Sequence, residues 1–242
     1  MYNQEFLNII SKIENLEQIN TFKKREIEAN KILNSINKLY IKYNFDEIPI
    51  FVYGIHSSLL GEFNYLEKQY KLLNYLYEEF FISTKFNFKK YNINNSASLL
   101  LLNMEFAYLL IKLEKDEYFM KVYNNLWKII NILKEQQILN LELPEKDFLE
   151  NLLELLNLYN SIITLSKEKD INKIKKFLTF FFDTWFKNIN NEYFNFLDIL
   201  ILLQFIDKKL LNISSIKKDN NIKGKFNILK KEIENNIKRK TI

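Results

Sequence analysis

Cysteine is absent from this sequence, and glycine, proline and histidine are scarce: its 242 residues include three Gly, two Pro and one His. A chain without cysteine has no disulfide, no thiolate nucleophile, no cysteine-ligated zinc and no iron–sulfur cluster. We therefore expect a reducing compartment. The first residues, MYNQEFLNII, lack the basic and then apolar regions of a secretory signal, so we expect cytoplasmic localisation.

The shortage of glycine disfavours strands and phosphate-binding loops. Hairpin turns favour Asn-Gly or Asp-Gly, and neither dipeptide occurs in the chain. P-loops and dinucleotide-binding motifs need glycine to bring backbone N–H groups close to phosphate, so we expect no nucleotide cofactor, and no other cofactor is indicated. Helices joined by short Asn, Asp and Ser turns need far less glycine, so the sequence predicts an all-α fold.

Long hydrophobic runs are missing as well. The two longest charge-free runs, Ile48–Gly61 and Tyr91–Met104, span about 14 residues each, short of the roughly 20 that cross a bilayer. We therefore expect no transmembrane span.

What the chain has in abundance is apolar residues at helical spacing, since 48% of it is hydrophobic. Steps of three and four place apolar residues on one helix face in Thr21–Asn44, Phe63–Phe80, Phe119–Leu133 and Phe148–Ile162. Two other segments are apolar on most sides, as expected of central helices: Asn95–Leu113 and Glu192–Leu211. Further helices are expected at Asn3–Ile19, Asp170–Lys187 and Lys225–Lys238.

About nine helices joined by short turns predict a multi-helix bundle or a short α-solenoid of antiparallel helical hairpins. A solenoid would show internal repeats. One echo occurs, Glu62–Leu66 against Glu105–Leu109, and because no third copy follows we interpret it as a chance match.

The segment Phe45–Ser58 differs from the rest because it contains Pro49, Gly54 and the single histidine within an apolar run. A residue that precedes proline avoids the helical region, so helix is disfavoured just before Pro49. We predict a packed inter-helix loop with some β character.

Charge divides the chain unevenly. From Lys208 onward basic residues exceed acidic ones by eight, whereas the remainder carries three more acidic than basic residues. We predict a helical body over residues 1–211, with a sub-boundary near Leu143, where Pro144 and Glu145 favour the start of a helix. Residues 212–242 are predicted to form a basic C-terminal helix or tail.

His56 is the one side chain that titrates near neutral pH, so histidine-based chemistry would have to use it. A di-iron Glu-x-x-His motif would need Glu in place of Tyr53, and an Arg-x4-His pair would need Arg in place of Phe51. No zincin motif occurs, and no metal ligands are indicated. A structural histidine is the favoured interpretation, and an enzyme organised around His56 is the weakest of three hypotheses.

The C-terminal basic residues can neutralise phosphates and form an anion-binding or nucleic-acid-binding surface. The candidates are Lys217, Lys218, Lys223, Lys225, Lys230, Lys231, Lys238, Arg239 and Lys240. Recognition of DNA bases favours arginine, and this segment has a single arginine, Arg239. We therefore favour a solvated basic helix and keep nucleic-acid binding as the alternative. Apolar residues between the lysines predict docking of this helix on the body, and an anionic membrane surface is another option.

The favoured function is non-catalytic binding of another protein. Trp185 and Phe186 lie in an aromatic run that would form the core or, where exposed, anchor a partner, and His56 is a third candidate contact. The alternation of amphipathic and wholly apolar helices is similar to that of all-helical immunity proteins of bacterial toxin systems, although no residue motif supports the similarity. A toxin-neutralising immunity or antitoxin-type protein, with a cognate toxin as partner, and an adaptor are therefore hypotheses.

Overall fold

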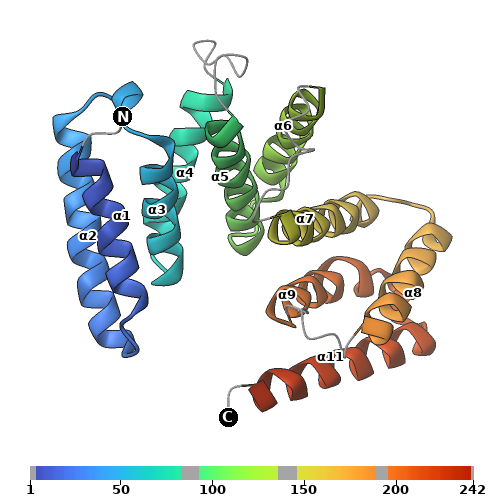
Figure 1. Ribbon diagram of the computed structural model, residues 1–242. Helices are drawn as coiled ribbons and strands as arrows, with labels where there is room; N and C mark the ends of the chain where they lie inside the picture. The colour runs from blue at the N-terminus through green and yellow to red at the C-terminus, as the bar shows by residue number, and fades with distance from the viewer. Residues whose placement is uncertain (1–3, 83–92, 136–145, 189–195, 241–242) are drawn as a thin grey trace. The chain divides into compact units, whose positions relative to one another are not determined.

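The computed structural model describes residues 4–82, 93–135, 146–188 and 196–240, and within these ranges it contains helices and turns but no strand (Figure 1). The all-α fold is therefore confirmed. The α-helices are α1 (Gln4–Glu17), α2 (Phe22–Lys42), α3 (Ile50–Glu62), α4 (Leu66–Tyr77), α5 (Ile93–Lys112), α6 (Asp116–Glu135), α7 (Lys146–Ser166), α8 (Ile171–Asn188), α9 (Phe196–Ile206), α10 (Ser214–Lys217) and α11 (Asn220–Lys240). A π-turn follows α4 and another follows α9: η2 (Glu78–Ile82) and η5 (Asp207–Leu211). None of the described helices is long and apolar enough to cross a membrane.

Nine of the eleven α-helices coincide with predicted segments, and the short α10 and all of α3 were missed. The prediction of a loop at Phe45–Ser58 was wrong, because Phe45–Glu47 form a 3₁₀ turn, η1, and α3 begins at Ile50. Ile48 is extended (φ −86°, ψ 123°), as expected before a proline. Pro49 directly precedes the helix, where a fixed φ suits a helix start and a missing N–H has no cost. Because α3 is buried on most sides, its sequence shows no amphipathic period.

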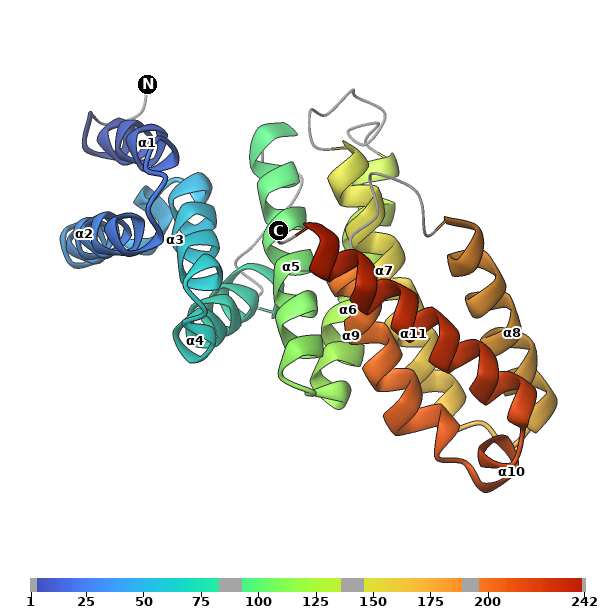
Figure 2. The ribbon, with the colours of Figure 1, turned by 90° about the horizontal axis from the view of Figure 1, so that it is seen from below.

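The chain divides into two compact units, one formed by Met1–Leu110 with Lys121–Pro144 and the other by Ile111–Met120 with Glu145–Ile242. In the first unit α1 packs on α2, α2 on α3 and α3 on α4 (Figure 2). Aromatic contacts then join α4 to α5, with the Tyr77 and Phe106 ring centroids 5.6 Å apart. From α1 to α5, each helix of this unit thus contacts its neighbour in the chain.

The turn between α3 and α4 shows how a helix ends here without glycine. Asn64 adopts the left-handed conformation (φ 58°), with its N–H donating to Gly61 O at 3.1 Å and the next N–H, of Tyr65, donating to Leu60 O at 2.8 Å. This pair of bonds is the Schellman motif, which usually has glycine at its left-handed position. The echo Glu62–Leu66 therefore spans a turn, whereas Glu105–Leu109 lies inside α5, so the chance-match interpretation is confirmed.

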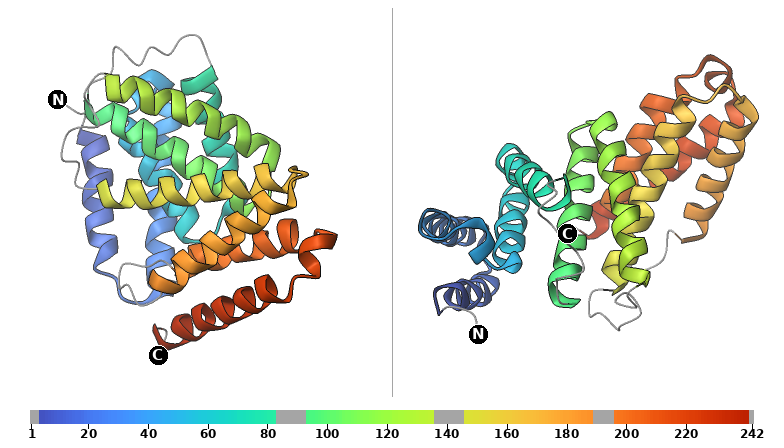
Figure 3. Two further views of the ribbon diagram at one scale, coloured as in Figure 1. Left: turned by 90° about the vertical axis from the view of Figure 1, so that its right-hand side faces the viewer. Right: turned by 90° about the horizontal axis from the view of Figure 1, so that it is seen from above.

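In the second unit α7 packs on α9 and η5, while α11 packs on α8 and α9 (Figure 3). The C-terminal basic segment is therefore a helix docked within this unit, and the residues that dock it, Ile222, Phe226, Leu229 and Ile233, are all buried. Ile228, an apolar residue of the same helix, is 57% exposed.

Residues 111–120, which comprise the end of α5, the following turn and the start of α6, belong to the second unit and contact α7 and η5. The Tyr159 hydroxyl donates to Asp116 Oδ1 at 2.7 Å, and the Phe119 ring meets the Tyr159 ring edge-on with centroids 4.9 Å apart. Lys209 of η5 forms an ion pair with Asp116. Burial raises the pKa of Tyr159, so its hydroxyl stays protonated and keeps donating.

Candidate functional site

His56 lies in α3 of the first unit and is 9% exposed, so it is a core residue. Its Nδ1 is 2.9 Å from the hydroxyl of Tyr40, whose ring stacks on Tyr53 at a centroid distance of 5.3 Å. Burial lowers the pKa of His56 to about 4, because the imidazolium would lose its hydration. At neutral pH the ring is therefore uncharged and joins α3 to α2. Burial of His56 argues against contact between its side chain and a partner. The predicted role of His56 in partner binding stays a prediction.

A second polar cluster joins α3, α4 and α5 in the first unit. The Gln69 side-chain amide donates to Ser57 O at 3.2 Å, to Ser57 Oγ at 3.3 Å and to Glu105 Oε1 at 3.3 Å. It passes so close to Gly61 that a Cβ there would lie 2.8 Å from Gln69 Nε2. No sequence signal pointed to this cluster, because its members come from three helices.

The two clusters do not combine into a catalytic arrangement. His56 and Ser57 are consecutive on a helix, so their side chains point about 100° apart. His56 pairs with Tyr40 and Ser57 pairs with Gln69. Among the described residues no group of three or more His, Asp or Glu side chains could hold a metal ion.

The candidate anion-binding residues lie on α10 and α11, where acidic residues interrupt them. Lys225 forms an ion pair with Asp183 of α8 at 2.5 Å, which uses its charge inside the second unit. Glu234 lies four residues after Lys230 and four before Lys238, a spacing that places it between them on one helix face. The basic segment is thus partly neutralised.

The aromatic run of α8 divides between the interior and the surface of the second unit. Phe181 and Phe182 are buried, and the side chains of Trp185 and Phe186 are half-buried, with the Trp185 ring centroid 5.9 Å from that of Phe181. Phe180 alone among the five is 69% exposed. Composition alone does not distinguish Phe180 from the rest of the run. The helical period carries the missing signal, since Phe180 shares a face with Lys176 and Lys187.

The surface of α8 is hollowed around Phe180. An open hollow of about 550 Å³ is lined by Lys175, Lys176, Thr179, Phe180, Asp183, Thr184 and Lys187. Two lining residues are tied to neighbouring elements, since Lys175 pairs with Asp219 at 2.7 Å and Asp183 pairs with Lys225. Lys176 and Lys187 are exposed and have no acidic partner among the described residues. The hollow therefore presents an aromatic ring between two uncompensated positive charges.

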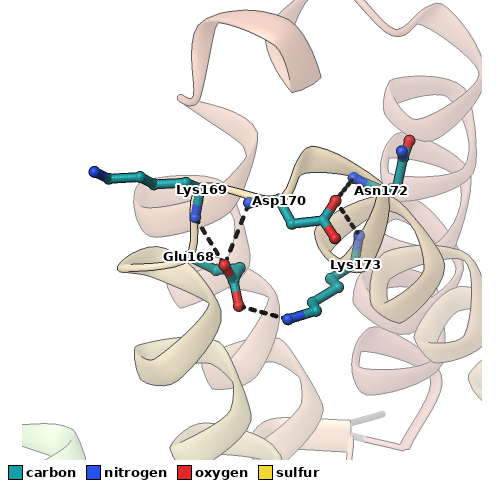
Figure 4. A network of polar contacts seen from close by, with 5 residues as sticks. All are labelled: Glu168, Lys169, Asp170, Asn172 and Lys173. Carbon is teal, nitrogen blue, oxygen red and sulfur yellow. Dashed lines mark hydrogen bonds and ion pairs between the residues drawn. The ribbon is translucent and has the colours of Figure 1, made fainter.

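Capping side chains hold the start of α8 in place (Figure 4). Asp170 Oδ1 accepts hydrogen bonds from the Asn172 and Lys173 N–H groups at 2.9 and 3.4 Å, a standard N-cap contact. Glu168 pairs with Lys173 Nζ at 3.1 Å and also accepts from the Lys169 and Asp170 N–H groups. The Lys173 contact, followed by these backbone donors, lowers the pKa of Glu168. The helix that carries the hollow therefore has a well-defined beginning.

Comparison of the chain with protein-family models, with curated proteins and with solved structures finds no match. A function must therefore be inferred from the chain's own residues.

Proposed function

We propose that this chain is a non-catalytic helical protein that binds another protein, and that the outward face of α8 around Phe180 is the contact surface. The observation that supports this proposal is a 69% exposed aromatic side chain inside a hollow of about 550 Å³. Aromatic anchors that fill or meet pockets dominate the energy of protein interfaces. An adaptor and an immunity or antitoxin-type protein that binds a toxin are both compatible with such a surface.

Burial of Phe180 would contribute measurably to binding. Covering a fully exposed phenylalanine side chain contributes about 1.5–3 kcal/mol, so covering the exposed part of Phe180 contributes about 1–2 kcal/mol. The half-buried Trp185 and Phe186 lie five and six residues after Phe180, on other faces of α8, and are not part of the proposed surface. His56 is not part of this proposal.

Affinity capture with matched variants tests the proposed surface. The full-length chain is used as bait in an extract of its own organism, beside Phe180→Asp and Ile228→Asp. Ile228 is the control because it is also an exposed apolar residue of the second unit, on α11 rather than α8. We expect a protein retained by the wild type and by Ile228→Asp but lost with Phe180→Asp. Equal retention by all three baits would exclude the α8 surface.

Nucleic-acid association is the second candidate, favoured by the exposed positions of Lys217 on α10, Lys218 directly after it and Lys231 on α11. Deleting these helices is a poor test, because α11 packs on α8 and α9. Changing all three lysines to Glu keeps the helix intact. If they contact phosphates of a single-stranded dT20 oligonucleotide, the slope of log affinity against log salt should fall by about 2. An unchanged slope would argue against this candidate.

A further inference from the structure

We infer that the α8 hollow binds an acidic amphipathic helix of the partner, with two carboxylates facing Lys176 and Lys187 and an apolar side chain resting on Phe180. This inference rests on the proposed protein-binding function and specifies the chemistry of the partner.

The spacing along α8 defines the pattern to be matched. Phe180 lies four residues after Lys176 and seven before Lys187, so all three residues lie on one face of the helix. At a rise of 1.5 Å per residue, the backbone positions of the two lysines are about 16 Å apart along the helix axis. Phe180 lies about 6 Å along the axis from Lys176 and about 10 Å from Lys187. Charge, aromatic ring and charge thus form a line along the helix axis.

The charge of this line is set by which lining residues already have partners. Lys175 is held by Asp219, and the one lining carboxylate, Asp183, is held by Lys225. What remains for a ligand is positive at both ends of the hollow and apolar in the middle. A complementary segment is therefore negative, apolar and negative in the same order, since complementary potentials favour association and like charges oppose it.

A protein helix matches this surface better than a nucleic acid does. All seven lining residues belong to one helix and cover Lys175 to Lys187, so the hollow follows α8 rather than surrounding a compact ligand. Its described lining has no arginine and a single aromatic ring, whereas nucleic-acid surfaces use arginine and repeated stacking.

A partner helix nearly parallel to α8 would need its two acidic residues eleven positions apart to face the two lysines. Eleven residues are about three helical turns, so both acidic residues lie on the same face of that helix. Its apolar contact would stand between them, four residues from one acid and seven from the other. In a parallel orientation the expected pattern is acid-x3-apolar-x6-acid, and in an antiparallel orientation it is acid-x6-apolar-x3-acid.

Selection from a displayed library of 20-residue helical peptides tests this inference without assuming the partner. Full-length wild-type protein is the target, and enriched peptides are measured by fluorescence anisotropy against four variants: Phe180→Asp, the double variant Lys176→Glu and Lys187→Glu, and the controls Ile228→Asp and Lys231→Glu. Circular dichroism checks that each variant is folded, which the exposure of all five positions favours.

We expect enriched peptides to carry the acidic–apolar–acidic pattern, and to lose about tenfold or more in affinity with Phe180→Asp and with the lysine double variant. The two controls should stay within about twofold of wild type, and a peptide with its acids changed to Lys should regain binding to the double variant. High salt should weaken the wild-type complex.

The possible failures separate this inference from the proposed function. If the peptides need Phe180 but bind the lysine double variant normally, the proposed protein-binding surface stands and the acidic partner is refuted. Enrichment that is insensitive to Phe180→Asp, or no enrichment, would refute both. Binding of dT20 that depends on Phe180 and Lys176 would replace the protein partner with a nucleic acid.

Discussion

Changing Gly61 to alanine should destabilise the protein while Gln69 is present and stabilise it once Gln69 is removed. The added Cβ would lie 2.8 Å from Gln69 Nε2, closer than the two atoms tolerate, so the amide must move. Gln69 is 5% exposed, and its amide would leave its acceptors Ser57 and Glu105. A buried donor without a partner costs about 1–3 kcal/mol. Replacing a helical glycine with alanine contributes up to about 1 kcal/mol in the opposite direction.

The net expectation is a loss of about 0.5–2 kcal/mol in the free energy of unfolding for Gly61→Ala. In a Gln69→Ala background the same change should instead add up to about 1 kcal/mol, because the atoms that crowd the new methyl group are gone. A double-mutant cycle measured by urea unfolding, with helicity followed by circular dichroism, gives the coupling between the two sites.

Gly54 provides the matched control, since it lies in the same helix and a Cβ there meets no atom within 4 Å. Gly54→Ala should stabilise the protein by up to about 1 kcal/mol in both backgrounds. The reasoning would be refuted if Gly61→Ala and Gly54→Ala had the same effect, or if removing Gln69 left the effect of Gly61→Ala unchanged.

Three further predictions concern single positions. Burial lowers the pKa of His56 to about 4, whereas the unfolded chain has a histidine pKa of about 6.5. The unfolded state therefore binds a proton more readily, and the protein should lose about 3 kcal/mol of stability as the pH falls from 6.5 to 4. NMR titration of this sole histidine measures the pKa, and a midpoint above about 6 would contradict the prediction. Asn103 is buried, and neither polar atom of its side chain has a hydrogen-bond partner among the described residues, so Asn103→Leu should raise the free energy of unfolding by about 1–3 kcal/mol. Asn125→Leu, which loses a bond to the Tyr77 hydroxyl, should lower it. Chemical denaturation that gives both variants the same sign would contradict this prediction. Glu114 has a φ of 53° and an exposed ion pair with Lys208. Relief of about 1–2 kcal/mol of left-handed strain outweighs the loss of this pair, so Glu114→Gly should raise the melting temperature, while Glu117→Gly, in the first turn of α6, should lower it. A lower melting temperature for both variants would argue against strain at Glu114.

Helix identity followed from the sequence wherever one face of a helix is polar. The segment from Phe63 to Phe80 shows the three-and-four period because α4 buries Leu73, Leu76 and Tyr77 and exposes its charged residues. The same period failed for α3, which is buried on most sides and contains Gly54. A local pattern reports burial on one side of a helix, and a helix surrounded by others loses that signal.

The candidate site was only partly foreseen. The aromatic run of α8 was singled out from its composition, yet the structure exposes Phe180 and half-buries Trp185. The C-terminal lysines were singled out from their charge, and pairing of Lys225 with Asp183 across two helices could not be read from spacing. Such pairs depend on which helices become neighbours.

Composition and periodicity were sufficient for the all-α class and for the position of most helices. These properties follow from local backbone preferences and from the side of each helix that avoids water. The packing of α11 on α8, the contact between Gly61 and Gln69 and the exposure of Phe180 depended on the folded chain. The first joins residues distant in sequence and the second joins two consecutive helices across a turn, so neither can be read from the spacing within one helix. The exposure of Phe180 depends on which face of α8 the neighbouring helices cover.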